Sequence, residues 1–319
     1  MEERRSGNYG ASIWDDAYVQ SLTTPYAAKE YLEQAEKLKL QVKIIIDKTG
    51  DQLDQLELID ILQRLDISNH FEDAIQKILD NIYQGTLKYC LDRDIEKDLY
   101  ATALQFRLLR QHGFHVPQEV FCSFMDEVRN FKTCLTGDVK GILCLYEASF
   151  LALEGETILD LAKDFAAYQL RELIRLERIM DWSLAKLVGR ALEMPLHWRV
   201  QKLEARWFIN FYETRPDVNL ILLEFAKLDF NMVQAQYQDE IKHVCRWYKE
   251  TGLPEKLSFA RHRLAECFLW ALGLTPEPHL GYTRKILTKI AAFITIMDDI
   301  YDVYGTLDEL KVFTETIER

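Results

Sequence analysis

A helical repeat of apolar residues is the feature that most constrains what this chain can fold into. From Ala28 the apolar positions advance by steps of three and four residues, as on one face of an α-helix: Ala28, Tyr31, Ala35, Leu38, Val42 and Ile45. Only 13 glycines and seven prolines occur in 319 residues, so few positions interrupt such helices. No segment shows a convincing alternation with a period of two. The sequence therefore predicts an all-α protein.

Further periodic stretches predict helices along the rest of the chain. They are expected at about 53–65, 71–91, 95–112, 117–131, 138–153, 157–192, 197–213, 220–250, 258–273 and 282–304. Thr24 and Pro25 are typical of a helix N-terminus, and Ser258 is a candidate N-cap.

A turn at residues 214–217 is the best domain boundary, because its proline separates two long predicted helices. We therefore predict an N-terminal arm over residues 1–24, a helical domain over 25–213 and a second helical domain over 217–319.

The overall charge limits the partners of the protein. The chain carries 39 Lys and Arg against 51 Asp and Glu, a net charge of −12, so it would repel the phosphate backbone of nucleic acids. A local cationic pocket for a small phosphorylated ligand is compatible with that charge. No apolar run reaches the roughly 18–20 residues of a membrane span, and the first residues lack the apolar core of a secretory signal. The six cysteines lack zinc-site spacing, so most are expected to be buried free thiols in a reducing compartment.

The run Asp-Asp-Ile-Tyr-Asp at 298–302 is the sharpest chemical motif. On an α-helix, Asp298 and Asp302 would share one face about 6 Å apart, while Asp299 would point roughly 100° away. Neighbouring carboxylates repel each other unless a cation bridges them, and hard oxygen ligands suit Mg²⁺ or Mn²⁺ shared with a substrate's phosphates. Ile294, one turn earlier, adds an apolar wall, so the face suits an apolar diphosphate. Alone, the run would also suit a solvated acidic helix end.

Two arginines precede this motif. With Ser258 as N-cap, Arg261 and Arg263 would lie near a helix N-terminus, where guanidinium groups and free N–H donors bind anions. Metal ions and arginines could then hold one diphosphate from two sides, although ordinary surface arginines are the alternative. Trp270, further along the same predicted helix, is either a packed core residue or an aromatic face that stabilises a carbocation.

Together these motifs resemble those of plant terpene synthases, specifically the angiosperm monoterpene-synthase branch. Arg4-Arg5, followed after eight residues by Trp14, is similar to the tandem-arginine element of that branch, although such a pair is also typical of a solvated tail. FARHRLAECFLWALG at 259–273 resembles its R-x-R region, with His262 where an acidic residue is more usual. ITIMDDIYDVYGTLDEL at 294–310 resembles its aspartate-rich motif, and further likeness covers nearly the whole chain.

The resemblance implies an N-terminal α-helical barrel and a C-terminal class I bundle. In that family Asp298 and Asp302 would bind Mg²⁺ or Mn²⁺, and Asp299 belongs to the same metal motif. Arg261 and Arg263 would hold the diphosphate of the substrate. These residues would make the protein a lyase that ionises geranyl diphosphate and forms an acyclic or cyclic monoterpene.

Other residues of the resemblance would surround the hydrocarbon. Trp270 and Ile294 would line its pocket, while Arg4 and Arg5 would close the site and assist the isomerisation of geranyl diphosphate. The family also implies a monomer and a plastid location, although the chain contains no transit peptide and would otherwise be cytoplasmic.

One departure from the family concerns its second metal motif, N/D-D-x-x-S/T-x-x-x-E, which this sequence does not contain. We therefore expect a C-terminally truncated form that does not turn over substrate. The alternatives are a sesquiterpene or hemiterpene synthase of the same fold, and a non-catalytic helical protein.

Overall fold

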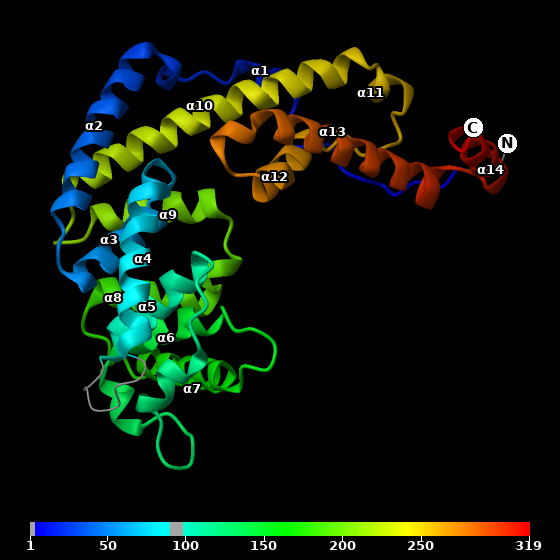
Figure 1. Cartoon of the computed structure of the whole chain (residues 1–319). Coiled ribbons are helices and arrows are strands. Elements are labelled where there is room, and N and C mark those ends of the chain that lie inside the picture. The colour runs from blue at the N-terminus through cyan, green and yellow to red at the C-terminus, as the bar shows by residue number, and fades with distance from the viewer. Residues whose placement is uncertain (1–3, 90–97) are drawn as a thin grey trace. The chain divides into compact units, whose positions relative to one another are not determined.

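The computed structural model describes residues 4–89 and 98–319, and these form helices and loops with one isolated bridge between Met125 and Phe131 (Figure 1). The prediction of an all-α protein is confirmed. The α-helices are α1 (Asp16–Ser21), α2 (Lys29–Lys48), α3 (Gln52–Arg64), α4 (Glu72–Tyr89), α5 (Leu99–Gln111), α6 (Val139–Ser149), α7 (Thr157–Arg175), α8 (Trp182–Glu193), α9 (Gln201–Glu213), α10 (Leu220–Glu250), α11 (Leu253–Lys256), α12 (Leu264–Leu274), α13 (Gly281–Asp298) and α14 (Leu307–Ile317).

Shorter helical turns connect these helices. The 3₁₀ turns are Pro25–Ala27, Ser68–Phe71, Gln118–Phe124, Thr133–Gly137, Leu196–Trp198 and Pro278–Leu280, and a π-helix, Asp299–Tyr304, continues α13. Thr24 caps the first 3₁₀ turn rather than an α-helix, because α2 begins only at Lys29. Within the described ranges, no helix combines the length and the apolar composition that crossing a membrane would need.

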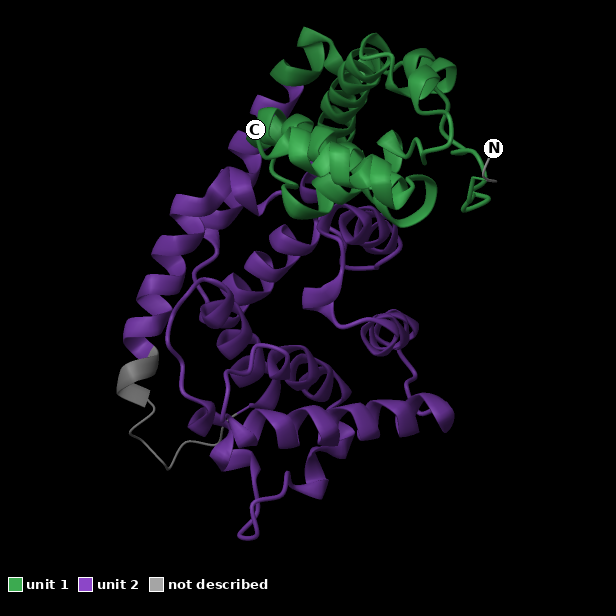
Figure 2. Cartoon of the chain, turned by 90° about the vertical axis from the view of Figure 1, so that its right-hand side faces the viewer, with its two compact units in different colours: residues 1–33, 228–319 green, residues 34–227 purple. Residues whose placement is uncertain are grey.

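The chain folds into two compact units, which Figure 2 colours separately. Unit 1 consists of residues 1–33 and 228–319, and unit 2 consists of residues 34–227. The expected boundary at 214–217 falls in the turn between α9 and α10. The division into segments 1–24, 25–213 and 217–319 stays a prediction.

Helix α6 forms the centre of unit 2. Its residues from Gly141 to Ser149 are all buried, as expected for a helix surrounded by other elements. Helices α5 and α7 pack against it, and Leu108 and Leu170 contribute fully buried side chains. Asp138 begins α6, because its Oδ1 accepts a hydrogen bond from the Gly141 N–H at 2.8 Å.

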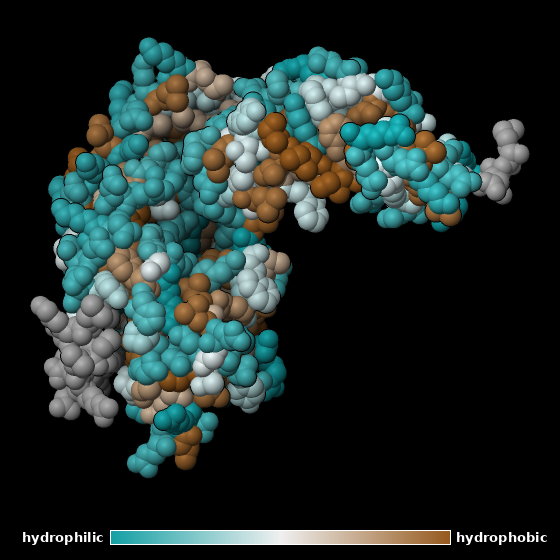
Figure 3. All heavy atoms as spheres, turned by 45° about the vertical axis from the view of Figure 1, so that its right-hand side comes forward, coloured by the Kyte–Doolittle hydropathy of each residue, from teal (hydrophilic) through white to brown (hydrophobic). Residues whose placement is uncertain are grey.

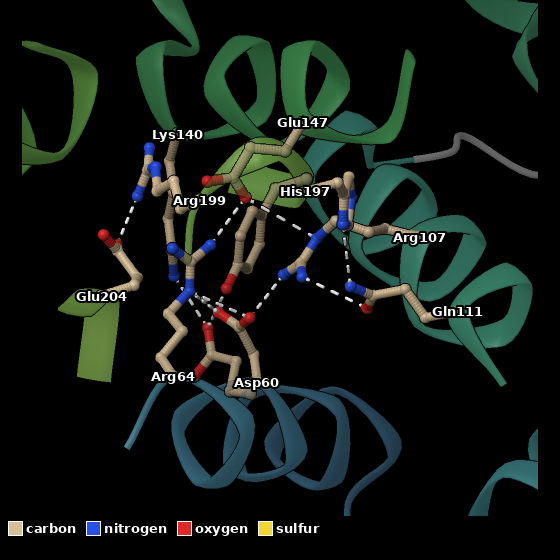
Figure 4. Close-up of polar contacts among 11 residues, drawn as sticks. Asp60, Arg64, Arg107, Gln111, Lys140, Glu147, His197, Arg199 and Glu204 are labelled. Carbon is tan, nitrogen blue, oxygen red and sulfur yellow. Dashed lines mark hydrogen bonds and ion pairs between the residues drawn. The ribbon is translucent and has the colours of Figure 1, made fainter. Parts of the chain in front are cut away.

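Four charged side chains form a buried ion network beside α6 (Figure 4). Arg64 donates to Asp60 at 3.0 Å and to Glu147 at 2.6 Å, and Arg107 donates to Asp60 at 2.6 Å. The Arg64 and Arg107 side chains are only 9% and 1% exposed. Burial by itself raises the pKa of Asp60, but the charges of Arg107 and Arg64 outweigh burial and lower that pKa to about 2. The Asp60 carboxylate and the two guanidinium groups therefore remain ionised inside the unit.

His197 gives unit 2 a predicted pH dependence. Burial lowers the pKa of His197 from 6.5 to about 4, and the charge of Arg107 acts in the same direction. Between these pH values the unfolded chain binds a proton that the folded chain does not, so the free energy of unfolding falls as pH drops from 6.5 to 4. Allowing for the partial exposure of the ring, we expect a loss of roughly 2 kcal/mol across this window.

Urea unfolding of the protein and of His197→Gln at a series of pH values measures this effect. The variant should lose most of the slope between pH 6.5 and 4, whereas His279→Gln, at an exposed position, should keep it. Equal slopes for the protein and His197→Gln would contradict the prediction.

Two helices of unit 2 were expected over the wrong residues. The stretch 117–131 forms a 3₁₀ turn and then a tight loop, in which Asp126 Oδ1 accepts hydrogen bonds from the N–H groups of Val128 and Asn130. This side-chain competition with the backbone ends the helical pattern. The stretch 157–192 divides into α7 and α8, because Glu177 adopts a φ of 51° and Asp181 caps a new helix.

The cysteine prediction is confirmed for three residues and wrong for two. Cys144, Cys245 and Cys267 are buried free thiols, and burial raises the pKa of Cys144 to about 12, which makes it a poor nucleophile. Cys122 and Cys134 are free but exposed. Cys90 lies outside the described residues.

A buried arginine holds unit 1 together. Arg284 of α13 is 0% exposed, and its guanidinium donates to both carboxylate oxygens of Glu240 on α10, at 2.8 and 2.9 Å. The same group donates to the carbonyls of Thr275, Glu277 and Pro278, which lie between α12 and α13. The packing is so close that a Cβ at Gly281 would lie 2.3 Å from Glu240 Oε1. Arg284 thereby fixes the N-terminal end of the helix that carries the aspartate-rich motif.

Candidate active site

The aspartate-rich motif straddles a change of helix type. Asp298 ends α13, and Asp299–Tyr304 forms a π-helix, whose wider turn departs from the α-helical spacing expected for the motif. Asp298 and Asp302 are exposed, and in the described part of the chain neither carboxylate has a hydrogen bond or ion pair. Exposed and unpaired carboxylate oxygens suit a hard divalent cation. No group of three or more metal-ligating side chains occurs among the described residues, and the binding of metal by Asp298 and Asp302 stays a prediction.

Asp299 has a different environment from its two neighbours. It is 1% exposed, and its carboxylate accepts hydrogen bonds from the Arg261 N–H at 2.6 Å and from Arg261 Nε at 2.8 Å. Asp299 therefore joins the aspartate-rich motif to the arginine segment, and the expectation that it also binds metal stays a prediction.

The arginine segment does not open a helix as expected. Ser258 lies in a turn, and α12 begins only at Leu264, after Arg263 at the N-cap position. The anchor of the segment is His262, whose Nδ1 lies 2.8 Å from the Tyr248 hydroxyl and whose Nε2 lies 3.2 Å from the Leu257 carbonyl. These two contacts hold the segment 257–263 in a turn and an irregular loop in place of the predicted first helical turn.

The N-terminal arm contacts both arginines. The Arg263 guanidinium donates to the Gly10 carbonyl, and the Arg261 guanidinium lies 4.5 Å from the centre of the Tyr9 ring. Cation–π contact of this kind favours a fixed position for the guanidinium. The arm, the arginine segment and the aspartate-rich motif therefore meet in one part of unit 1.

Arg4 binds to the segment after the aspartate-rich motif. It forms a two-bond ion pair with Glu309, at 2.5 and 2.6 Å, and its guanidinium lies 5.0 Å from the centre of the Tyr304 ring. Tyr304 in turn stacks on Phe259 at 3.6 Å. Hydrogen bonds from Arg4 and then from Thr306 lower the pKa of Glu309 to about 2, so the pair persists at neutral pH. The tether supports the expectation that Arg4 closes the site, which stays a prediction.

Arg5 differs from Arg4. It is exposed, and within the described residues it has no hydrogen bond or ion pair. Its expected part in isomerising the substrate stays a prediction.

Trp270 and Ile294 lie on exposed surfaces. Trp270, on α12, is 74% exposed and Ile294, on α13, is 55% exposed, so the alternative of a packed core tryptophan is wrong. Phe293 and Ile290 are also nearly half exposed on α13. Figure 3 shows apolar side chains gathered in patches on the surface of the molecule. That Trp270 and Ile294 line a hydrocarbon pocket stays a prediction.

Sequence reasoning missed the residues that organise this site, namely Glu309, Tyr304, Phe259 and Tyr9. One signal was available for Glu309. Thr306 and Glu309 form a capping box at the start of α14, and the Thr-x-x-Glu pattern predicts such a box. Glu309 also pairs with Arg4, which lies 305 residues earlier in the chain. No local sequence pattern indicates that contact.

Comparison with known proteins decides the family. The N-terminal domain of terpene synthases matches residues 13–192, and the metal-binding domain of the terpene synthase family matches residues 249–319. The chain belongs to the terpene synthase family. The resemblance seen in the motifs is thereby confirmed, and the family consists of lyases that act on prenyl diphosphates.

Individual relatives of this terpene synthase chain cover it almost completely. Trans-alpha-bergamotene synthase from Phyla dulcis is 66% identical over 100% of the chain and 58% of the relative. The chloroplastic myrcene synthase from Quercus ilex is 53% identical over 99% of the chain and 52% of the relative. The chain thus spans somewhat more than half the length of the curated relatives it matches.

Solved structures of terpene synthases share the fold. Limonene synthase with 2-fluorolinalyl diphosphate is 46% identical, with a TM-score of 0.95 over 99% of this chain and 58% of that chain. Isoprene synthase from grey poplar leaves, in complex with three Mg²⁺ ions and dimethylallyl-S-thiolodiphosphate, has a TM-score of 0.85 at 46% identity, over 97% of this chain and 56% of that chain. The metal-binding domain of the family thus matches this chain, the isoprene synthase structure contains Mg²⁺, and the free carboxylates of Asp298 and Asp302 would fit such an ion.

Proposed function

We propose that the protein ionises a prenyl diphosphate and converts the resulting allylic cation to a terpene. The observation that carries this proposal is the contact between Asp299 and Arg261. Through it, the arginine segment adjoins the aspartate-rich motif, so cationic groups and the free carboxylates of Asp298 and Asp302 are available to one diphosphate.

The residues of unit 1 have distinct parts in this reaction. Asp298 and Asp302 would hold Mg²⁺, which when bound neutralises negative charge on the departing diphosphate. Arg263 and the exposed part of Arg261 would donate hydrogen bonds to the same group, and Asp299 positions Arg261 for this purpose. Because these donors are oriented before the reaction, they stabilise the charge as the carbon–oxygen bond breaks.

The hydrocarbon part of the substrate needs apolar surroundings. Trp270 would offer an aromatic face to the cation and Ile294 an apolar wall, both on exposed surfaces of unit 1. Arg4, held by Glu309 and Tyr304, would fix the N-terminal arm near the site and exclude water. Without that exclusion, water would capture the cation before it rearranges.

Two substrates are supported by different observations. The tandem arginines and the myrcene synthase relative favour geranyl diphosphate. The bergamotene synthase relative, at 66% identity, favours farnesyl diphosphate, because bergamotene is a sesquiterpene. The chloroplastic relative supports a plastid location, and we propose a monomer.

Turnover assays test the proposal. The protein is incubated with Mg²⁺ and, separately, geranyl, farnesyl and dimethylallyl diphosphates, and products are identified by gas chromatography and mass spectrometry. We expect no terpene from the 319-residue chain alone. A chain completed to the length of its relatives should form a terpene from one of the two longer diphosphates, and none once a chelator removes the metal. Tight binding of a protein partner without any turnover would instead favour a non-catalytic helical protein.

A further inference from the structure

Unit 2 contains a cavity that the proposed reaction does not use. Its volume is about 310 Å³, and all its lining residues lie between Glu57 and Asp217. This volume is at the lower end of the about 300–1,000 Å³ typical of sites for small molecules. One part of the wall is apolar and consists of Ile61, Leu104, Leu143, Leu184, Leu187 and Phe208. The cavity is therefore large enough for a small ligand with an apolar body.

The rest of the wall is charged, but its charges are matched. Arg64 and Arg107 belong to the buried ion network with Asp60 and Glu147, so two positive charges face two negative charges. A ligand that carries a negative charge would have to separate a guanidinium group from its carboxylate. Breaking a buried pair in this way costs several kcal/mol, roughly 3–5, because one charge is left without a partner.

The remaining charges of the wall are also engaged. Lys140 Nζ lies 2.7 Å from Glu57 Oε1, and Arg215 Nε donates to Asp217 at 2.8 Å. Asp181 accepts hydrogen bonds from the backbone N–H groups that begin α8. Each cation of the lining is thus already paired with a carboxylate, although Arg107 Nε is buried without a hydrogen bond, 3.6 Å from Glu147 Oε2. Among the described residues, no cluster of three or more carboxylates could hold a metal ion. The lining selects a neutral ligand.

The ion network also explains why the cavity stays open. Charged side chains that are bonded to one another cannot rotate into the cavity without losing their partners. Apolar side chains in their place could fill the cavity without a loss of stability. Glu57 offers a polar attachment point at this wall. Its Oε1 accepts from the Tyr100 hydroxyl at 2.9 Å and from Lys140, while among the described residues its Oε2 accepts no hydrogen bond. A hydroxyl group of a ligand could donate to that oxygen.

We propose that this cavity binds a small, neutral, amphipathic alcohol. The apolar body of the ligand packs against the leucines of α5, α6 and α8, and its hydroxyl donates to Glu57. The site lies wholly within unit 2, so its ligand binds independently of the metal and of the proposed reaction.

Calorimetric titrations test this proposal with three compounds that contain the same number of carbon atoms. Geraniol carries a hydroxyl, geranyl diphosphate carries a diphosphate, and myrcene carries no polar group. In metal-free buffer, we expect geraniol to bind the 319-residue chain at least about tenfold more tightly than either of the others. Equal affinity for geraniol and myrcene, or binding of the diphosphate that the cavity substitution Leu184→Trp weakens, would overturn the proposal.

Substitutions locate the binding. Leu184→Trp places a larger ring in the cavity and should weaken geraniol binding at least about tenfold, while Leu153→Trp, at a residue of unit 2 that is 61% exposed, should leave it unchanged. Circular dichroism and urea unfolding establish that each variant is folded, and Leu187→Phe replaces Leu184→Trp if the latter unfolds. Unchanged affinity in the folded cavity variant would place the alcohol elsewhere, on the exposed apolar surface of unit 1, and so refute the proposal.

Discussion

Replacing Arg284 by methionine is expected to lower the free energy of unfolding of unit 1 by about 3–5 kcal/mol. The substitution leaves the buried carboxylate of Glu240 without its partner and removes the donor for three carbonyl groups. A charge that is buried and unpaired costs far more than the ion pair contributes, which explains the size of the effect. Urea unfolding followed by circular dichroism measures it.

Two comparisons separate this effect from the mere loss of a positive charge. Arg246→Met, on the same unit but exposed, should change stability by less than about 0.5 kcal/mol. The double variant Arg284→Met with Glu240→Leu should recover part of the loss, because neither buried charge then remains. If the single and double variants are equally unstable, the carbonyl contacts rather than the ion pair dominate, and the expectation is wrong.

Asp302→Asn and Asp298→Asn are each expected to weaken the binding of Mn²⁺ with inorganic pyrophosphate at least about 100-fold. Loss of a residue that merely supports a metal ligand commonly costs about 10–100-fold in affinity, so loss of a direct ligand should cost at least as much. Both carboxylates are exposed, so their substitution should leave the free energy of unfolding nearly unchanged. Electron paramagnetic resonance of bound Mn²⁺ measures the affinity.

Asp299→Asn should behave in the opposite way. Its carboxylate is buried and bonded to Arg261, so the variant should lose about 1.5–3 kcal/mol of stability while metal affinity falls much less than in the other two variants. Asp308→Asn, whose side chain is 96% exposed, is the matched control and should change neither quantity. A loss of Mn²⁺ affinity in Asp299→Asn equal to that in Asp302→Asn would instead support Asp299 as a metal ligand.

Most helices could be predicted because a helix with one buried face has apolar residues at a regular spacing in the sequence. Ala35, Leu38 and Val42 of α2 are buried as the predicted period requires, while the next buried residue is Ile46 rather than Ile45, and Ala28 lies exposed before the helix. The loop at 125–131 was missed because its conformation is decided by one side chain, that of Asp126, which bonds to its own backbone. Periodicity carries no information about such local competition.

The site was predicted in its residue types but not in its connections. The sequence indicated that Asp298, Asp302, Arg261 and Arg263 belong together. It could not indicate that Asp299 and Arg261 bond to each other, since the contact joins residues 38 positions apart through the packing of unit 1. The start of α12 was misplaced for a related reason, because His262 contacts Tyr248 on another helix and thereby holds its segment outside α12.

The π-helix at Asp299–Tyr304 has a consequence for anyone who transplants this motif onto a designed scaffold. A hydrogen-bonded π turn contains one residue more than an α turn. The same five residues placed on an ideal α-helix would therefore rotate every later side chain about the helix axis by up to about 100°. Deleting a single residue just after Asp302 would impose the same change of phase on Tyr304 and Glu309. The motif keeps its side-chain geometry on a new scaffold only if the π-helical conformation is transferred with it.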